Sequence, residues 1–446
     1  MSAPFGLICA LTMLCAAVPL GAAPEDSDGE LVLTLDDAVA RALEHSVNLQ
    51  KGRITLETRE YASKRLWAEV FPTISATAGI GYQNIPLFTA SGDRRMGGEY
   101  FNYSTSIGVS LSLSAGIPQR MKLLSLAYQQ ELLSYEDTRR LLEIATAQEF
   151  YALIAVKENL AQHEETLGLA ERQLEKHRIG RANGLVSEAV LLQSRLTVET
   201  AKYDLSAARS AYSTRLGVFL NSLGLALETP VKLEGEFHIR RVAVDAEQLI
   251  RDYLPRRPDI EQQRQAIAKA ELTERQNILD RRAPSLSLSL GWQGGSGSGG
   301  FTQPYADSIR GSATVSIPIN PWIPGTRDAQ NLRSDKSEIE RALLDLKNTE
   351  DTAAAQIRSL AASLESSWES LEIARLREEI AGRSYEYSEQ AFLNGSMEAL
   401  ALENSRNNLA SARYQLLTSE LNYQNLVLDL ARAVNADWRQ FSGGSL

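Results

Sequence analysis

Residues 183–212 read NGLVSEAVLLQSRLTVETAKYDLSAARSAY, and residues 394–423 read NGSMEALALENSRNNLASARYQLLTSELNY. A shift of 211 residues, from position 183 to position 394, superimposes the two stretches without a gap and matches Asn-Gly, Ser-Arg and tyrosine positions. A shift of 212 residues likewise superimposes residues 283–287 on residues 71–75. Two nearly equal offsets indicate a tandem duplication. The unit of roughly 200 residues is far longer than a solenoid repeat.

Each copy begins with two runs in which apolar and polar residues alternate. The runs follow Pro72, start at Tyr103, follow Pro284 and end at Ile319. A period of two predicts β-strands, and runs of about 10 to 13 residues can cross a bilayer as tilted strands. The segments inside the two predicted hairpins, residues 84–102 and 294–307, are interpreted as long loops.

The polar face of these runs is almost entirely Ser, Thr and Gly, whereas strands of soluble proteins commonly carry Lys and Glu there. We therefore predict that this face lines a wet lumen rather than carrying the scattered hydroxyls of a soluble sheet. The predicted lumen residues are Ser106, Ser110, Ser112, Ser285, Ser287 and Ser289.

A pair of helices follows each predicted hairpin. Residues 119–179 and 326–392 contain no proline and one glycine each, and about 60 helical residues extend roughly 90 Å. The partner helices, about residues 187–223 and 398–434, repeat apolar residues in steps of three and four, which indicates coiled-coil packing. An Asn-Gly pair separates the helices of each pair, because a left-handed residue ends one helix before the next begins.

These patterns divide the chain into consecutive segments. They are a signal peptide (1–23), an N-terminal segment with the first helices (24–71), the first hairpin (72–118), the first helical pair (119–224, with its tip near 183–185), a linker (225–257), a helix (258–283), the second hairpin (284–320), the second helical pair (321–436, with its tip near 394–396) and a tail (437–446). The linker is expected to pack with the N-terminal segment and the tail as one small subdomain.

The first 23 residues predict export. They contain no charged residue, and the apolar run that ends at Leu20 is too short to span a bilayer comfortably. Small residues up to Ala23 favour cleavage there, with lipidation of Cys15 as the alternative. Since Cys9 and Cys15 are the two cysteines of the chain, the mature protein is expected to have no disulfide and no cysteine metal site.

The composition excludes several classes of function. With 46 Lys and Arg against 56 Asp and Glu and a pI near 5.2, a nucleic-acid surface is not expected. The four histidines have no metal-ligand spacing and are interpreted as surface residues: His45, His163, His177 and His238. No catalytic residues, metal or cofactor are predicted, so the chain is not expected to be an enzyme.

Four membrane-length strands require partner strands, because a sheet with open edges leaves backbone groups unpaired in lipid. Eight strands make about the smallest closed barrel. The pattern allows two, three or four chains, and three chains would give a wider lumen.

The order of these motifs resembles the outer-membrane efflux (TolC-like) family. The resemblance rests on Thr34-Leu35-Asp36-Asp37-Ala38, on the strand entries at Pro72 and Pro284, on the Gly184 and Gly395 turns, and on Arg257-Pro258-Asp259-Ile260. It implies a mixed α and β membrane protein, a homotrimer with a 12-stranded β-barrel in the outer-membrane lipid and a helical barrel in the periplasm. It also implies the passive exit duct of a tripartite efflux or type I secretion system, with a periplasmic adaptor (membrane fusion) protein and an inner-membrane pump (RND, ABC or similar).

The resemblance also assigns sites. The adaptor would dock at the tips, which are Asn183, Gly184, Leu185, Asn394, Gly395 and Ser396. Where well-known members place paired aspartates of a periplasmic constriction, this chain has Ala401 and Asn404. The gate charge would then shift to Glu398 and Glu403, whose alternative interpretation is solvated helix-surface charge. The alternative function is an envelope-spanning structural or adhesive coiled coil without transport.

Overall fold

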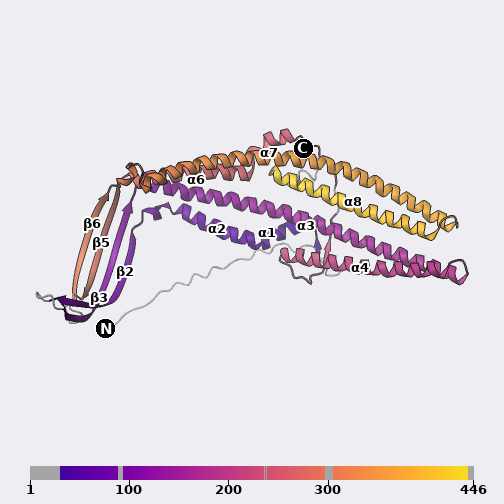
Figure 1. The fold of residues 1–446 in the computed structure, drawn as a ribbon, viewed down its shortest axis with the longest axis horizontal. Helices are drawn as coiled ribbons and strands as arrows, with labels where there is room; N and C mark the ends of the chain where they lie inside the picture. The colour runs from indigo at the N-terminus through magenta and orange to yellow at the C-terminus, as the bar shows by residue number, and fades with distance from the viewer. Residues whose placement is uncertain (1–30, 89–93, 236, 238, 297–304, 440–446) are drawn as a thin grey trace. The chain divides into compact units, whose positions relative to one another are not determined.

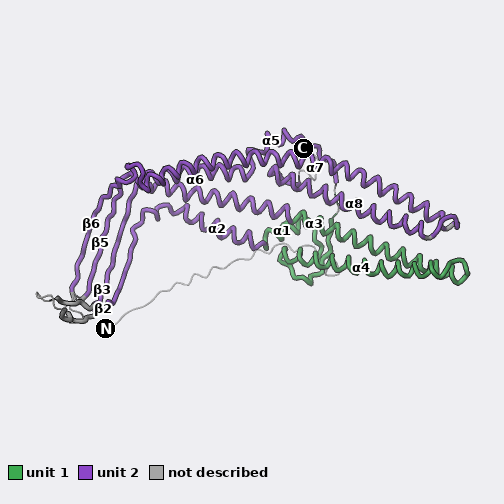
Figure 2. The backbone as a smooth tube through the Cα atoms, in the orientation of Figure 1, with its two compact units in different colours: residues 1–45, 146–237 green, residues 46–145, 238–446 purple. Residues whose placement is uncertain are grey.

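A computed structural model describes residues 31–88, 94–235, 237, 239–296 and 305–439. The expected signal peptide (1–23) lies outside these residues. Contacts within the chain form two compact units (Figure 2). Unit 1 comprises residues 1–45 and 146–237, and unit 2 comprises residues 46–145 and 238–446. The predicted linker (225–257) is therefore divided between the two units and is not one subdomain.

The long helices form where the sequence predicts them (Figure 1). They are α3 (Ile117–Ala182), α4 (Glu188–Ser222), α7 (Arg327–Leu393) and α8 (Ala399–Ala433). The α3 helix has 66 residues and α7 has 67. The α7 helix begins after Thr326, whose side chain accepts a hydrogen bond from the Ala329 N–H, and it continues without a proline to its end.

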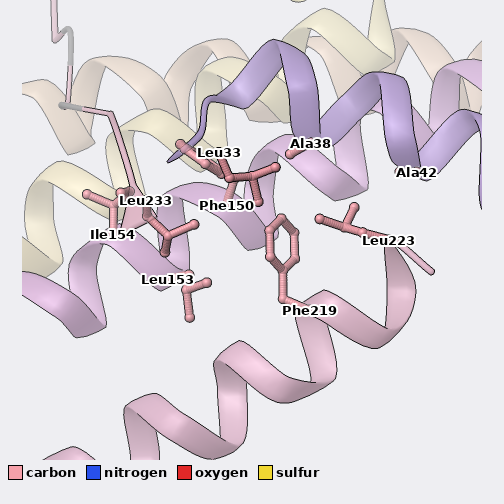
Figure 3. Close-up of a cluster of buried hydrophobic side chains, with 9 residues drawn as sticks. All are labelled: Leu33, Ala38, Ala42, Phe150, Leu153, Ile154, Phe219, Leu223 and Leu233. Carbon is pink, nitrogen blue, oxygen red and sulfur yellow. The ribbon is translucent and has the colours of Figure 1, made fainter. Parts of the chain in front are cut away.

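Unit 1 has its core where the N-terminal segment meets α3 and α4. The strand β1 (Leu31–Leu33) pairs in parallel with β4 (Val231–Leu233). The helix α1 (Leu35–His45) begins with a side-chain cap, because Thr34 Oγ1 accepts from the Asp37 N–H at 3.3 Å and donates to Asp37 Oδ2 at 2.6 Å. Figure 3 shows the buried cluster: Leu33, Ala38, Ala42, Phe150, Leu153, Ile154, Phe219, Leu223 and Leu233.

Unit 2 contains the sheet, α2 (Val47–Lys64), α5 (Ala246–Tyr253), α6 (Pro258–Arg282), α7 and α8. Short 3-10 turns cover Leu66–Val70, Leu254–Arg256 and Asn320–Trp322.

Two side chains of unit 2 join distant segments of the chain. Arg257 forms an ion pair with Asp259 and donates to the Ala433 carbonyl at the end of α8, each at 2.7 Å. The buried Tyr423 hydroxyl donates to the Arg240 carbonyl at 2.9 Å and accepts from the Val242 N–H at 3.0 Å. These contacts hold the second part of the predicted linker on α8.

The sheet has four antiparallel strands in the order β2-β3-β5-β6. They are β2 (Thr73–Phe88), β3 (Arg94–Leu113), β5 (Ser285–Ser296) and β6 (Tyr305–Ser316). The prediction of a long loop over residues 84–102 was wrong, because β2 and β3 continue to pair as far as Phe88 and Arg94. A register shift between Asn84 and Pro86 accommodates the proline, which has no N–H for the ladder.

The second predicted loop, residues 294–307, is shorter in the structure. The strand β5 extends to Ser296 and β6 starts at Tyr305, while residues 297–304 lie outside the described residues. The fourth alternating run ends earlier than predicted, because β6 stops at Ser316 and Ile319 lies in the segment after it. Pro318 interrupts that segment and cannot donate to a ladder.

Candidate functional site

The six predicted lumen serines lie on one face of the sheet. Cross-strand partners share a face in an antiparallel sheet, and Ser110 is opposite Ser289 while Ser112 is opposite Ser287. Ser106 and Ser285 occupy the same face, because each lies an even number of positions along its strand from these residues. Two hydrogen bonds confirm that hydroxyls meet across this face: Thr77 with Ser106 at 2.6 Å, and Ser289 with Ser312 at 2.8 Å.

The opposite face of the sheet is apolar and exposed within one chain. Ile80 is 78% exposed and Ile309 is 73% exposed, and other large apolar side chains of this face are also exposed: Ile74, Ile107, Leu290 and Val315. A soluble domain would cover such a face, since large contiguous apolar surfaces mark contact with lipid or protein. One chain thus presents a sheet that is hydroxyl-rich on one side and apolar on the other.

The first tip connects α3 to α4 through a Schellman turn. Gly184 has φ 74°, Leu185 N–H donates to the Gly180 carbonyl at 2.8 Å, and Gly184 N–H donates to the Arg181 carbonyl at 3.1 Å. Ser187 then caps α4 by accepting from the Val190 N–H at 3.4 Å. These bonds satisfy the backbone of the turn and leave the Leu185 side chain 82% exposed.

The second tip repeats the turn but not the cap. Gly395 has φ 73°, Ser396 N–H donates to the Ala391 carbonyl at 2.9 Å, and Gly395 N–H donates to the Phe392 carbonyl at 3.0 Å. Glu398 stands where the first tip has its capping serine, and its side chain makes no cap hydrogen bond to α8. At Gly184 and at Gly395 an added Cβ would meet no atom within 4 Å, so both turns are open on the outside.

The two predicted gate glutamates have different surroundings. Glu398 is exposed at the start of α8. Glu403 is 25% exposed, and its Oε1 atom lies 3.8 Å from Arg406 Nη2. Glu403 is therefore part of an ion pair on the surface of α8, whereas Glu398 faces solvent.

Sequence reasoning missed a polar site between α3 and α4. His177 is only 5% exposed, so its interpretation as a surface residue was wrong. Ser194 Oγ donates to the Val190 carbonyl at 3.0 Å, and its contact with His177 Nδ1 therefore has the imidazole as donor. His177 Nε2 then accepts from Gln173 Nε2 at 2.7 Å. The heptad spacing of the sequence could have predicted the burial of His177, since this residue lies seven positions after Ala170, which is also buried.

In the part of the chain that the structure describes, no group of three or more His, Cys, Asp or Glu side chains is placed to hold a metal ion. Among the helices of the same residues, none combines the length and the apolar character needed to cross a membrane.

Comparison with known proteins decides the family. The family model described as "Outer membrane efflux protein" matches residues 38–224 and 249–436, so that each copy of the duplication has its own match. The chain belongs to the outer membrane efflux protein family. This membership places the protein in the outer membrane and assigns it to transport, which excludes the alternative of an adhesive coiled coil without transport.

Curated relatives of this outer membrane efflux protein come from Pseudomonas putida. The toluene efflux pump outer membrane protein TtgC of that species is 25% identical over 428 residues. The antibiotic efflux pump outer membrane protein ArpC is 24% identical over 435 residues. Each alignment covers 92% of this chain and 84% of the relative.

Solved structures of low sequence identity share the fold. The CmeC outer membrane channel of Campylobacter jejuni gives a TM-score of 0.71 at 17% identity, over 91% of this chain and 88% of that chain. The open MtrE outer membrane channel of Neisseria gonorrhoeae gives 0.67 at 16% identity, over 90% and 89%. The mixed architecture of strands and long helices predicted for this outer membrane efflux protein is thus that of known channels.

Proposed function

We propose that three copies of this chain close a 12-stranded β-barrel in the outer membrane and continue as a helical barrel into the periplasm. The observation that carries the proposal is the four-stranded sheet, with its hydroxyl face, its exposed apolar face and its two edge strands. Because all neighbouring strands are antiparallel, the edges β2 and β6 run in opposite directions. The β6 edge of one copy can therefore pair with the β2 edge of the next, and every added copy preserves the alternation.

We propose three copies instead of two because a duct needs an open lumen. Eight strands from two copies would form a barrel filled by its own side chains, whereas twelve leave an open interior. The hydroxyl face, with Ser106, Ser110, Ser112, Ser285, Ser287 and Ser289, would line that interior. The apolar face would meet the outer-membrane lipid.

The duct itself is passive in this proposal. An inner-membrane pump (RND, ABC or similar) would supply the energy, and a periplasmic adaptor would connect pump and duct in a tripartite efflux or type I secretion system. The efflux pump names of the relatives support this arrangement. The tips are the proposed adaptor-docking sites, because the backbone N–H groups of their residues bond within each turn and both turns are open on the outside. Their residues are Asn183, Gly184, Leu185, Asn394, Gly395 and Ser396.

We also propose Glu398 and Glu403 as the acidic residues of a periplasmic gate. Both lie within the first turns after the second tip, where three copies would bring like charges together. The contact of Glu403 with Arg406 reduces its share of that charge, so the gate would depend mainly on Glu398.

Conductance and mass test the proposal together. We expect the purified protein to give uniform ion-permeable steps in planar bilayers, and chemical cross-linking in mild detergent to stop at the mass of three chains. A protein that never conducts, even with its tip residues substituted, would contradict the duct. A dominant monomer or dimer in mild detergent would contradict the trimer.

A further inference from the structure

Arg310 is a charged residue on the hydroxyl face of the sheet. It lies on the edge strand β6 opposite Gly291, and it is two positions from Ser312, whose hydroxyl meets Ser289 on that face. Its side chain is exposed. The alternation of the strand therefore directs an arginine to the side of the sheet that is otherwise covered by serine and threonine.

The row of residues across the sheet from Arg310 has little side-chain bulk. Gly291 is opposite Gly108, which is in turn opposite Ser75 on the other edge strand. An added Cβ at Gly291 would meet only the Ile107 carbonyl at 3.7 Å, and one at Gly108 would meet only Ser75 Oγ at 3.4 Å. The two positions level with Arg310 on β5 and β3 therefore carry no side chain.

The nearest acidic residue on the same strand lies on the opposite face. Asp307 is three positions from Arg310, so the two side chains alternate to different sides. The Asp307 carboxylate accepts a hydrogen bond from Trp292 Nε1 at 3.2 Å on the apolar face. At the strand positions whose side chains the structure describes, the hydroxyl face carries Ser, Thr, Gly, Ala, Asn and Gln beside Arg310 and has no carboxylate.

We propose that Arg310 gives the lumen a local positive potential that favours anionic over cationic solutes. The proposal rests on the proposed barrel, in which three copies would place three guanidinium groups at one level. Rings of Arg or Lys are a known physical basis for anion preference in pores. The effect would be local, because salt screens a charge over about 8 Å at physiological ionic strength. It would also be opposite in sign to the net charge of −10 of the chain.

A cysteine beside Arg310 measures this potential directly. In Ser312→Cys, the reporter thiol lies two positions away on the same face, and thiol-reactive methanethiosulfonates of opposite charge report the local concentration of anions and cations. The variant is compared with Ser312→Cys/Arg310→Gln, which removes the charge, and with Ser312→Cys/Arg310→Lys, which keeps it. The parent protein gives the background, and cross-linked mass establishes equal assembly.

Removal of the charge should lower the ratio of anionic to cationic reaction rates by about two- to fivefold, by screened electrostatics. The lysine variant should retain most of the ratio, and higher salt should reduce the difference. An unchanged ratio in the glutamine variant would overturn the role of Arg310 while the reactive thiol still supports a wet lumen. A thiol that reacts with neither reagent would contradict the wet lumen itself, and with it both proposals.

Discussion

Glu420 shows how a single side chain of the helical region responds to pH. It is half-buried on α8, and its Oε1 atom lies 3.8 Å from Arg375 Nη2. Burial raises the pKa of the Glu420 carboxyl above its ordinary value of 4.5, and Arg375 opposes part of this shift. The folded protein therefore binds a proton here more readily than the unfolded chain does.

The direction of this pKa shift predicts the effect of a substitution. Stability should fall as the pH rises from about 4.5 through the raised pKa of Glu420, because the charged form is less favourable in the folded state. Glu420→Gln should flatten this fall and leave stability at pH 7 equal or higher. Thermal unfolding followed by circular dichroism at several pH values measures this change. The exposed Glu386→Gln is the matched control, and a steeper pH dependence in Glu420→Gln would contradict the interpretation.

Single residues also show what the sequence could predict. Leu205 and Tyr423 lie in the partner helices whose apolar repeats indicated coiled-coil packing, and both side chains are buried. These repeats could not predict that the Tyr423 hydroxyl would hold residues 240–242, since that contact joins segments about 180 positions apart and has no local pattern. The His177 site was missed because a polar residue in a heptad seam was judged by its type and not by its position.

At the scale of elements, turn chemistry and helix length were predictable, while strand ends were not. Residues 119–179 contain no proline and one glycine, so the absence of helix-breaking residues indicates the extent of α3. The strands β2 and β3 continue past the alternating pattern through Pro86, Gly97 and Gly98, residue types that normally indicate a loop. There the pairing of two strands determines the structure, and pairing is not visible in one strand alone.

The tips give a prediction for docking. Gly184→Trp and Gly395→Trp should abolish efflux and leave the assembled protein intact, because the bulky side chain would occupy the open outer side of each turn. Accumulation of a pump substrate in cells measures efflux, and cross-linked mass measures assembly.

A third glycine supplies the control for this experiment. Gly325 also has a positive φ, 86°, with no atom within 4 Å of an added Cβ, so Gly325→Trp carries the same backbone strain and bulk away from the tips. We expect this variant to retain efflux. Normal efflux in both tip variants would refute the adaptor-docking assignment, and loss in all three would attribute the effect to strain.

At the scale of the whole molecule, the two sheet edges determine how copies meet. Within one chain β2 and β6 are separated by β3 and β5, so a disulfide between them requires two chains. We therefore expect Ser312→Cys on β6, combined in turn with Thr73→Cys, Ser75→Cys or Thr77→Cys on β2, to form oxidised species for at least one pair. Bridging requires Cα atoms about 5.5 Å apart, so the productive pair would also report the register between copies.

The number of chains in the oxidised species shows whether the sheet closes after three copies. Species of up to three chains and none larger are expected. In a closed ring of three copies, every β6 edge is paired with the β2 edge of the next copy, so no edge is left to bind a fourth. A ladder that continues beyond three chains would indicate an open or larger assembly. The single-cysteine variants are the controls, since each can join at most two chains. No bridge from any pair would contradict edge-to-edge closure.

The same two edges have a consequence for genetics. Every copy supplies one β2 edge and one β6 edge. Under the proposed closure, one copy with a damaged edge is therefore enough to prevent the ring from closing. A cell that expresses an intact gene together with one whose β6 is damaged would build mixed rings, and most of them would contain at least one faulty subunit. Damage to an edge strand should therefore be dominant, whereas a deletion of the whole gene, which contributes no subunit, should be recessive.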